Sequence, residues 1–285
     1  MGQSLNNIKR RINTVNSTRK ITSAMKLVAN VKSRRFMREL KNHEDFVKET
    51  KTILNDALFS LNDDELTTIN PLLTHYSNAK KRLVIIVTSS LGLCGGYNNE
   101  VYKYYSDFYK DGDEVITIGE KGFIEYSKKK NLKIYTEFTN VLDKVEISEL
   151  KGLIDFIDSK YLTGEYRSVE VIYHRYINSL ISKVESIQIL PLIFKEEKKV
   201  EISPVFLPDI NTVINTLIPQ YINVTIYEKF VSSLVSEYSA RRNAMDNADK
   251  NAKDLVEKLR LEYNKERQSS ITQEITEVVS GSLNK

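Results

Sequence analysis

The sequence predicts an α/β fold in which long N- and C-terminal helices form an antiparallel coiled coil beside a central domain with a mostly parallel sheet. Three observations predict it. The chain has no glycine between Gly2 and Gly92, a heptad pattern repeats near its C-terminus, and strands alternate with helices in between. We therefore expect an N-terminal coiled-coil helix over residues 1–61, a central α/β domain over 62–208 and a C-terminal coiled-coil helix over 209–285.

The N-terminal helix is predicted from its lack of glycine and proline and from a heptad track. The track begins at Leu5, Ile8, Ile12 and Val15. It loses strict phase around Arg19 and Thr22, which indicates a stutter. It continues through Ile21, Met25 and Val28 and resumes as Phe36, Leu40, His43, Val47, Thr50, Leu54, Ala57 and Leu61. We expect the helix to end in the polar stretch 62–64.

The central part alternates strand and helix patterns. Predicted strands cover residues 82–88, 114–119, 132–138, 169–177 and 184–192, and predicted helices cover 98–108, 120–130 and 147–161. This order indicates a Rossmann-like domain with a mostly parallel sheet, in which the last two strands are neighbours. Residues 195–199 read as a charged turn.

The C-terminal helix carries the strongest pattern in the chain. Eleven positions at alternating steps of three and four residues run from Val224 to Leu259, and all except Arg241 are apolar or aromatic: Val224, Tyr227, Val231, Leu234, Tyr238, Arg241, Met245, Ala248, Ala252, Leu255 and Leu259. Asp209 is the expected N-cap. Pro219 is expected to kink the helix or delay its start. Ala244, Ala248 and Ala252 would allow a neighbouring helix to approach closely.

The net charge of +4 conceals an uneven distribution. Residues 1–38 contain ten lysines and arginines and no acidic residue. This segment could bind nucleic acid, serve as an organelle presequence, face an acidic protein surface or simply be solvated. The presequence is the weakest of these, because the segment continues into a long heptad-patterned helix. No run of 18 apolar residues predicts a transmembrane helix, and the N-terminal residues lack an apolar signal core, so we do not expect secretion.

Catalytic signatures are sparse. The glycine-rich turn at residues 91–97 lies between a strand and a helix but matches neither the dinucleotide fingerprint nor the P-loop. Cys94 is the single cysteine, so no internal disulfide forms, and no histidine near it in sequence would activate a thiolate. His43, His75 and His174 have no metal-ligand spacing. We expect a chain that is not an enzyme by itself and binds no cofactor or metal.

The last helical turns combine polar and apolar residues. Gln268 and Thr272 are one turn apart on one face. Ile271, Ile275, Val278 and Val279 continue an apolar stripe where the partner helix is expected to have ended. An apolar tip on a long helix suggests a socket in another protein, although an ordinary exposed helix end has the same pattern.

Three blocks resemble the γ subunit of F-type ATP synthases. They are Lys20-Ile-Thr-Ser-Ala-Met-Lys-Leu-Val-Ala29, Gly92-Leu-Cys-Gly-Gly-Tyr-Asn98, and the long run from Leu261 to Glu277. The resemblance covers nearly the whole chain and implies a non-catalytic central rotor shaft. In this family the shaft couples ATP synthesis or hydrolysis in an α3β3 hexamer to rotation and proton translocation, and the resemblance implies the same for this chain. The resemblance also implies a foot next to an ε subunit and a membrane c-ring, with ATP, ADP and Mg bound only by partner subunits.

The resemblance implies roles for individual residues. Arg267, Gln268, Thr272 and Glu274 correspond to residues that hydrogen-bond a β-subunit loop. Met25, with Lys20 and Lys26, lies where the shaft meets the acidic β lever. Ile271, Ile275, Val278 and Val279 correspond to an apical bearing. It further implies a position at the cytoplasmic face of a bacterial membrane, peripheral and held through partners, without nucleic acid.

One position departs from the family pattern. Family members usually carry an acidic and a basic residue just before the Gly-Leu-Cys-Gly motif, and this chain has Ser90 and Leu91 there. One alternative is therefore a diverged motor whose hexamer drives a machine other than a proton channel. Two alternatives come from other classes: a coiled-coil adaptor that binds polyanions through residues 9–38, and a small-ligand α/β domain with a helical stalk.

Overall fold

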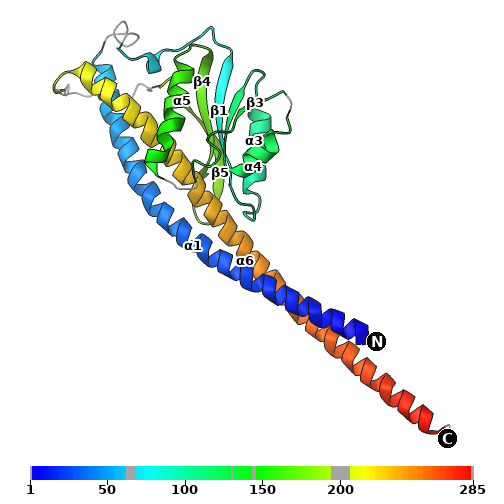
Figure 1. Cartoon of the computed structure of the whole chain (residues 1–285). Coiled ribbons are helices and arrows are strands. Elements are labelled where there is room, and N and C mark those ends of the chain that lie inside the picture. Colours follow the sequence, from blue (N-terminus) through cyan, green and yellow to red (C-terminus); the bar gives the residue numbers. More distant parts are fainter. Residues whose placement is uncertain (1, 62–68, 130, 143–145, 194–205, 284–285) are drawn as a thin grey trace. The chain divides into compact units, whose positions relative to one another are not determined.

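The computed structural model describes residues 2–61, 69–129, 131–142, 146–193 and 206–283. The predicted helix end at 62–64 and the charged turn at 195–199 lie outside them. The elements, in chain order, are α1 (Gly2–Phe59), η1 (Pro71–Leu73), β1 (Lys81–Val87), α3 (Tyr97–Phe108), β2 (Glu114–Ile118), α4 (Glu120–Tyr126), β3 (Lys133–Tyr135), η2 (Ile147–Leu150), α5 (Lys151–Tyr161), β4 (Tyr166–Tyr176), β5 (Ser182–Leu190) and α6 (Ile210–Leu283) (Figure 1).

The chain forms two compact units. One, here called the stalk unit, contains the chain up to Asn30 together with the chain from Arg241 onward, and the other, the sheet unit, contains Val31–Ala240. The long helices α1 and α6 each contribute to both units. The three-part division at residues 61 and 208 stays a prediction.

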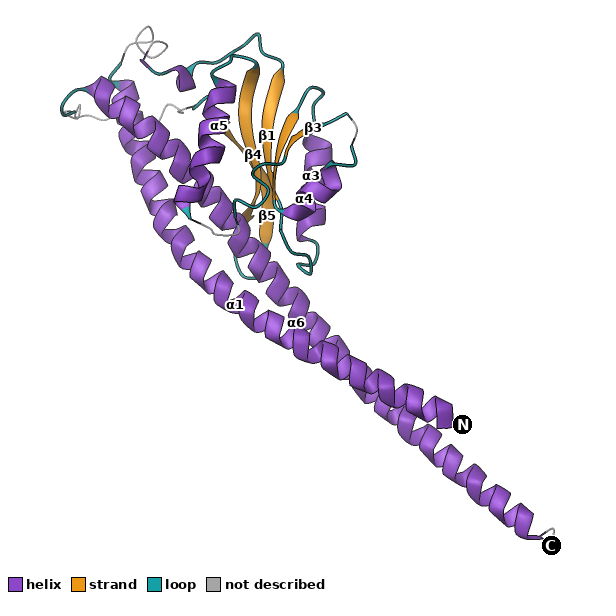
Figure 2. Cartoon of the chain, in the orientation of Figure 1, coloured by secondary structure: helices purple, strands orange, loops and turns teal. Residues whose placement is uncertain are grey.

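The sheet has five strands in the order β3-β2-β1-β4-β5. The β1–β2, β2–β3 and β1–β4 pairs are parallel, whereas β4 and β5 form an antiparallel hairpin. The predicted, mostly parallel α/β sheet with its last two strands adjacent is therefore confirmed (Figure 2). The third strand is shorter than predicted, and α4 ends at Tyr126 rather than at residue 130.

Helices cover both faces of the sheet because its central strands are apolar on both sides. On one face, Leu83 and Ile85 of β1 belong to a core shared with α5, α6 and the sheet-unit part of α1. On the other face, Val84 and Ile86 pack in a second core with α3 and with Tyr126 at the end of α4. Figure 1 shows these layers.

The long helices pack antiparallel within each unit, as predicted. In the sheet unit, Phe36 stacks on Tyr238 with ring centroids 5.7 Å apart. Further along α1 in the same unit, His43 meets Tyr227, which comes earlier in α6. In the stalk unit, Arg19 and Lys26 of α1 pair with Asp249 and Asp246 of α6, which again run in reverse order.

The stutter predicted near Arg19 and Thr22 is wrong. In the stalk unit the buried and half-buried positions of α1 follow unbroken steps of three and four residues: Leu5, Ile8, Ile12, Val15, Arg19, Thr22, Lys26 and Ala29. Polar side chains occupy seam positions because two of them, Arg19 and Lys26, form ion pairs with α6. The apolar Ile21 and Val28, predicted to lie on the track, are exposed instead.

The seam of α6 also differs from the prediction by one residue in the stalk unit. After Met245 it passes through Asp249, Ala252, Val256 and Leu259. Leu255 is consequently exposed, and the prediction that it lies in the seam is wrong. The shift places Asp249 where it can reach Arg19.

The start of α6 confirms one prediction and excludes one of the two effects expected of Pro219, a delayed start. Asp209 caps the helix, because its carboxylate accepts a hydrogen bond from the backbone N–H of Thr212 at 2.9 Å. Pro219 lies inside α6, so it does not delay the start at Ile210. Ile214, Ile218 and Ile222, which flank the proline on one side of the helix, are buried in the core and hold this segment in place.

Candidate partner-binding surfaces

The stalk-unit part of α1 carries an exposed apolar surface, here called the outer apolar face: Ile21, Ala24, Leu27 and Val28. The side chains of Ile21, Leu27 and Val28 are 61%, 63% and 56% exposed. Scattered apolar residues on a surface need no explanation, but a cluster of this size on two successive turns indicates a binding surface. Sequence reasoning missed it, because it assigned Ile21 and Val28 to the helix pair.

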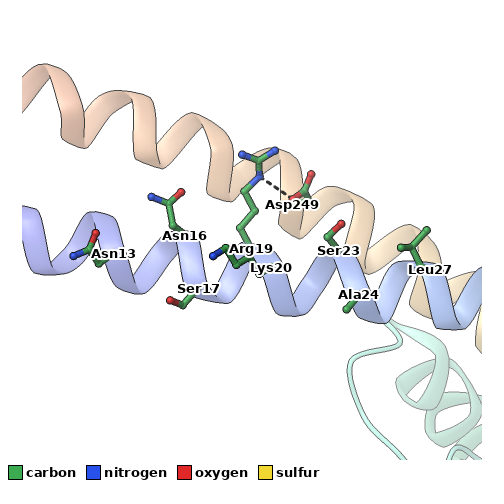
Figure 3. A pocket seen from close by; sticks show the side chains of 9 residues that line it. All are labelled: Asn13, Asn16, Ser17, Arg19, Lys20, Ser23, Ala24, Leu27 and Asp249. Atoms are coloured by element: carbon green, nitrogen blue, oxygen red, sulfur yellow. Dashed lines mark hydrogen bonds and ion pairs between the residues drawn. The ribbon is translucent and has the colours of Figure 1, made fainter.

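Two ion pairs hold α1 against α6 beside this face. Arg19 Nε donates to Asp249 Oδ1 at 3.0 Å (Figure 3). Lys26 Nζ donates to Asp246 Oδ1 at 2.5 Å. Asp246 also accepts from Lys250, one turn further along α6, at 2.8 Å. The hydrogen bonds from Lys250 and then Lys26 lower the pKa of Asp246 to about 2. The Asp246 carboxylate is therefore ionised at neutral pH. Two of the cations of α1, Arg19 and Lys26, have ion-pair partners within the stalk unit.

Other cations of α1 are not compensated in this way. Lys9, Arg10, Arg11 and Lys20 are exposed and form no ion pair within the described ranges of the chain. Lys20 borders an open depression of about 840 Å³, which Asn13, Ser17 and Leu27 also line (Figure 3). The surface of α1 therefore combines unpaired positive charge with apolar side chains.

The residues predicted to contact the β lever differ in their surroundings. Lys20 is exposed, whereas Met25 is half-buried in the stalk unit. Lys26 is half-buried too, and its charge is already engaged by Asp246. All three lie within two turns of α1. Of this group, Lys20 offers the most accessible charge.

The C-terminal turns of α6 present every described side chain to solvent after Ser270, up to Ser280. Arg267, Gln268, Thr272 and Glu274 are all exposed in the structure. The Thr272 hydroxyl donates to the backbone carbonyl of Gln268 at 2.9 Å, which orients its oxygen as an acceptor.

The four apolar residues of the predicted bearing lie in the same stretch. Ile271, Ile275, Val278 and Val279 are exposed, and they recur at helical spacing. The structure therefore presents the predicted tip residues to solvent on a regular helix.

The glycine-rich turn between β1 and α3 exposes two leucines. Leu91 and Leu93 are 68% and 61% exposed, and Leu93 has a φ of 64°, which a non-glycine residue rarely adopts. Beneath them, the Ser89 backbone N–H donates to Asn98 Oδ1 at 3.0 Å, and the Asn98 amide donates back to Ser89 Oγ at 2.8 Å. The turn is therefore held by its own hydrogen bonds.

The crevice at the carboxyl ends of β1 and β4 is filled by side chains. Open α/β sheets bind ligands at such a position, where the strand order reverses. Here the ring of Tyr97 stacks on His174 with centroids 4.0 Å apart, and both residues are buried. A ligand would have to displace both rings. We therefore interpret the glycine-rich turn at this site as a tight connection between β1 and α3.

The tautomer of His174 follows from its partners. Its Nε2 lies 3.0 Å from the carbonyl oxygen of Tyr97, which can only accept, so Nε2 carries the proton. Its Nδ1 lies 3.2 Å from Ser182 Oγ and accepts from that hydroxyl. Burial lowers the pKa of His174 to about 4, although the hydrogen bond to Tyr97 opposes this shift. The neutral ring is therefore the form that the fold accommodates.

Acid is expected to destabilise the fold through His174. Its pKa is about 4 in the folded chain and about 6.5 when unfolded, so the unfolded state binds more protons between these values. The free energy of unfolding should fall by about 3 kcal/mol as pH drops from 6.5 to 4. Urea unfolding at several pH values should show a flatter slope for His174→Gln than for the natural chain, and equal slopes would contradict the assignment.

The other candidate residues for chemistry have structural surroundings. Cys94 is buried beside Ser89 and Asn98, and His43 packs edge-on against Tyr227. His75 is exposed. Within the part of the chain that the structure describes, no three histidine, cysteine or acidic side chains are grouped to hold a metal ion.

Known proteins match the chain over nearly its whole length. A family described as ATP synthase matches residues 4–283. The ATP synthase gamma chain of Mesoplasma florum is 34% identical over 278 residues, which cover 97% of each chain. That of Mycoplasmopsis synoviae is 36% identical over 283 residues and 96% of each chain. The chain belongs to the ATP synthase gamma chain family.

Solved structures share the fold of this gamma chain. The rotor of the Euglena gracilis mitochondrial ATP synthase superposes with a TM-score of 0.68 at 16% identity, over 95% of this chain and all of that chain. The central stalk and c-ring structure of the Tetrahymena thermophila mitochondrial ATP synthase gives a TM-score of 0.56 at 21% identity. The match covers 80% of this chain and 99% of that chain.

Membership of the family settles the role of the chain at the level of the subunit. A gamma chain is a non-catalytic subunit of the ATP synthase complex and forms the central stalk of its rotor. The curated relatives named above are bacterial. None of the helices that the structure describes combines the length and hydropathy that crossing a bilayer requires.

Proposed function

We propose that this gamma chain is the shaft that couples ATP synthesis or hydrolysis in an α3β3 hexamer to rotation and proton translocation. The observation that carries this proposal is the full-length family match to a chain whose two long helices, α1 and α6, pack antiparallel. ATP, ADP and Mg belong to the partner subunits, so the shaft acts by contact alone.

The outer apolar face of α1 and the uncompensated charge of Lys20 are the proposed contact with the β lever. An acidic lever would complement a helix that carries no acidic residue before Glu39. The aliphatic side chains of Ile21 and Leu27 would supply the apolar centre of the contact. Met25 and Lys26 would support the face from the seam of the helix pair.

The exposed end of α6 is the proposed site of two further contacts. Arg267, Gln268, Thr272 and Glu274 would hydrogen-bond a loop of one β subunit. The apolar stripe that contains Ile271 and Ile275 would turn in an apolar bearing of the hexamer. Apolar contacts suit a bearing because they are non-directional, so few bonds break as the shaft turns.

Removing two of the polar groups is expected to weaken assembly. Arg267→Ala with Gln268→Ala should lower the affinity for the hexamer by about tenfold or more, since each hydrogen bond to a partner contributes about 1 kcal/mol and charged ones more. Titration of the labelled chain with purified hexamer measures this affinity. Thr216→Ala, which removes an exposed hydroxyl at the other end of α6, is the control. Unchanged affinity and ATP turnover in the double variant would count against these assignments.

At its other end the chain would contact an ε-type subunit and a c-ring, which would hold it peripherally at the cytoplasmic face of a bacterial membrane. Two mitochondrial ATP synthase structures of similar fold, from Euglena gracilis and Tetrahymena thermophila, support the c-ring contact, since each contains a c-ring together with F1 or the central stalk. One observation favours a second candidate, a motor that drives a different machine. The turn at Ser90 and Leu91 is uncharged and exposes Leu91 where the family usually carries a charged pair.

Purification from the native cells tests the proposal and separates the candidates. The tagged chain should recover α-like and β-like subunits near three of each per shaft, with ATP turnover. Recovery of a c-ring with them supports proton coupling, and other foot proteins in its place support the second candidate. Recovery without any hexamer would overturn the proposed function.

A further inference from the structure

Strand β4 extends beyond the end of its pairing with β1. The last residues that β1 and β4 pair are Ile86 and Ile172. On its other edge, β4 remains paired with β5 as far as Tyr176. The backbone groups that β4 directs toward the β1 side after Ile172 therefore need partners other than a strand, because a buried N–H or C=O without a partner is costly.

Serine hydroxyls of α6 bind these backbone groups. Ser233 Oγ accepts from the His174 N–H at 3.0 Å. Ser232 Oγ donates to the His174 carbonyl at 3.0 Å and accepts from the Tyr176 N–H at 3.0 Å. Ser236 Oγ donates to the same carbonyl at a longer distance, 3.5 Å. All three serines are buried, and together they are called the serine clamp.

The same turns of α6 are also tied to two other helices of the sheet unit. The Tyr97 hydroxyl, at the start of α3, donates to the backbone carbonyl of Ser233 at 3.2 Å. The hydroxyls of Ser33 in α1 and Ser239 in α6 lie 3.0 Å apart and are buried. Hydrogen bonds therefore fix this segment of α6 to a strand and to two helices.

Directional bonds and apolar packing constrain a helix differently. Around the clamp, α6 packs through Phe230, Val231 and Val235. Apolar packing opposes separation of the helix from the sheet but is non-directional. Hydrogen bonds require a defined distance and angle. The serine clamp therefore fixes how α6 is rotated about its own axis and where it lies along β4.

We propose that the serine clamp is the joint through which torque passes between α6 and the α/β sheet. This inference rests on the proposed function, because it assumes that the chain turns under load. Ser232 and Ser233 act as positioning residues that keep the sheet in register with the shaft helix. Ser236 contributes least, because its hydrogen bond to the His174 carbonyl is the longest of the clamp. Without Ser236, that carbonyl would still accept the hydrogen bond from Ser232 Oγ.

Hydrogen exchange tests the clamp without reference to rotation. In Ser232→Ala with Ser233→Ala, the amides of His174 and Tyr176 lose their acceptors, and their exchange should accelerate about tenfold or more. Ser236→Ala is the matched control, since it makes the same substitution at a buried position one turn away, and it should leave both amides nearly unchanged. If the double variant does not fold, Ser233→Ala alone should accelerate His174. Unchanged exchange would show that the clamp does not form.

A rotor measurement tests the torque role in the assembled complex. Lys103→Cys on α3 is an exposed attachment point for a probe, and the natural Cys94 is buried, so labelling is selective. With the hexamer held still, the probe on the double clamp variant should fluctuate over a wider range of angles than on Ser236→Ala. Turnover of ATP without load should be unchanged, which a merely destabilised shaft would not give.

The outcomes separate the two proposals. Faster exchange with an unaltered angular range would overturn the joint and leave the proposed function standing. A natural chain that forms no complex with a hexamer would overturn the proposed function, whereas hydrogen exchange would still report whether the clamp forms.

Discussion

Placing carboxylates on the outer apolar face of α1 is expected to disconnect the chain from its motor. In Ile21→Asp with Leu27→Asp, two exposed aliphatic side chains become charged, and an acidic lever would repel them. Central apolar residues of an interface contribute about 2 kcal/mol or more each, so affinity for the hexamer should fall by roughly a hundredfold or more. Binding of labelled chain to purified hexamer measures this, and ATP-driven rotation should be lost.

The fold should survive these substitutions. Both side chains are exposed in the stalk unit, so the helical content and unfolding midpoint of the isolated chain should change little. Ser23→Asp, an exposed position between them on the same helix, is the control that adds charge without removing aliphatic surface, and it should weaken binding far less. Full affinity in the double variant would show that the outer apolar face is not the contact.

Breaking the buried ion pair of the sheet is expected to have the largest effect on stability. Arg82 of β1 forms two parallel hydrogen bonds to Asp113, with Nε to Oδ1 at 2.8 Å and Nη2 to Oδ2 at 2.7 Å. It also donates to the Phe108 carbonyl at 3.0 Å. Both charged side chains are buried. Arg82→Ala leaves an unpaired buried carboxylate and should lower the free energy of unfolding by about 3–5 kcal/mol.

Arg175→Ala provides a matched control on the neighbouring strand β4. Arg175 pairs with Glu185 at 2.9 Å, but its side chain is half exposed to solvent. Exposed pairs contribute less than about 1 kcal/mol, so this variant should unfold near the natural midpoint. Urea unfolding compares the two. A loss for Arg82→Ala no larger than for Arg175→Ala would contradict the account of the buried pair.

The architecture could be predicted because its signals are periodic and long. The heptad steps of α6 and the continuous β-branched run of β1 each extend over enough residues to define an element. The absence of proline before Pro71, and of glycine from Glu165 to Ser280, supported the long helices in the same way. The cap at Asp209 followed from local chemistry alone, since an aspartate there can reach the first N–H groups of the helix.

The exact seam could not be predicted because it depends on pairs between helices. An apolar track favours Ile21 over its neighbour Thr22 and Ala248 over its neighbour Asp249, but Thr22 and Asp249 lie in the seam, where Asp249 pairs with Arg19. The outer apolar face became visible only once that register was known. The final contacts of this surface depend on a partner, and its sequence lies outside this chain.

The serine clamp had no sequence signal either. Serines in a helix are ordinary, and their role depends on β4 being longer than its pairing with β1, which only the register shows. The same holds for the crevice. A glycine-rich turn after a strand is typical of ligand sites, but here Tyr97 and His174 occupy the position that a ligand would take.

Single-molecule rotation tests the central claim most directly. A probe attached through Lys103→Cys is observed on the complex purified with this chain, with the hexamer fixed to a surface and ATP supplied. The account predicts rotation in one direction with three pauses in each turn, and its loss in Ile21→Asp with Leu27→Asp. ATP turnover by the same complex while the probe stays still would contradict the account, because the chain would then not be the shaft.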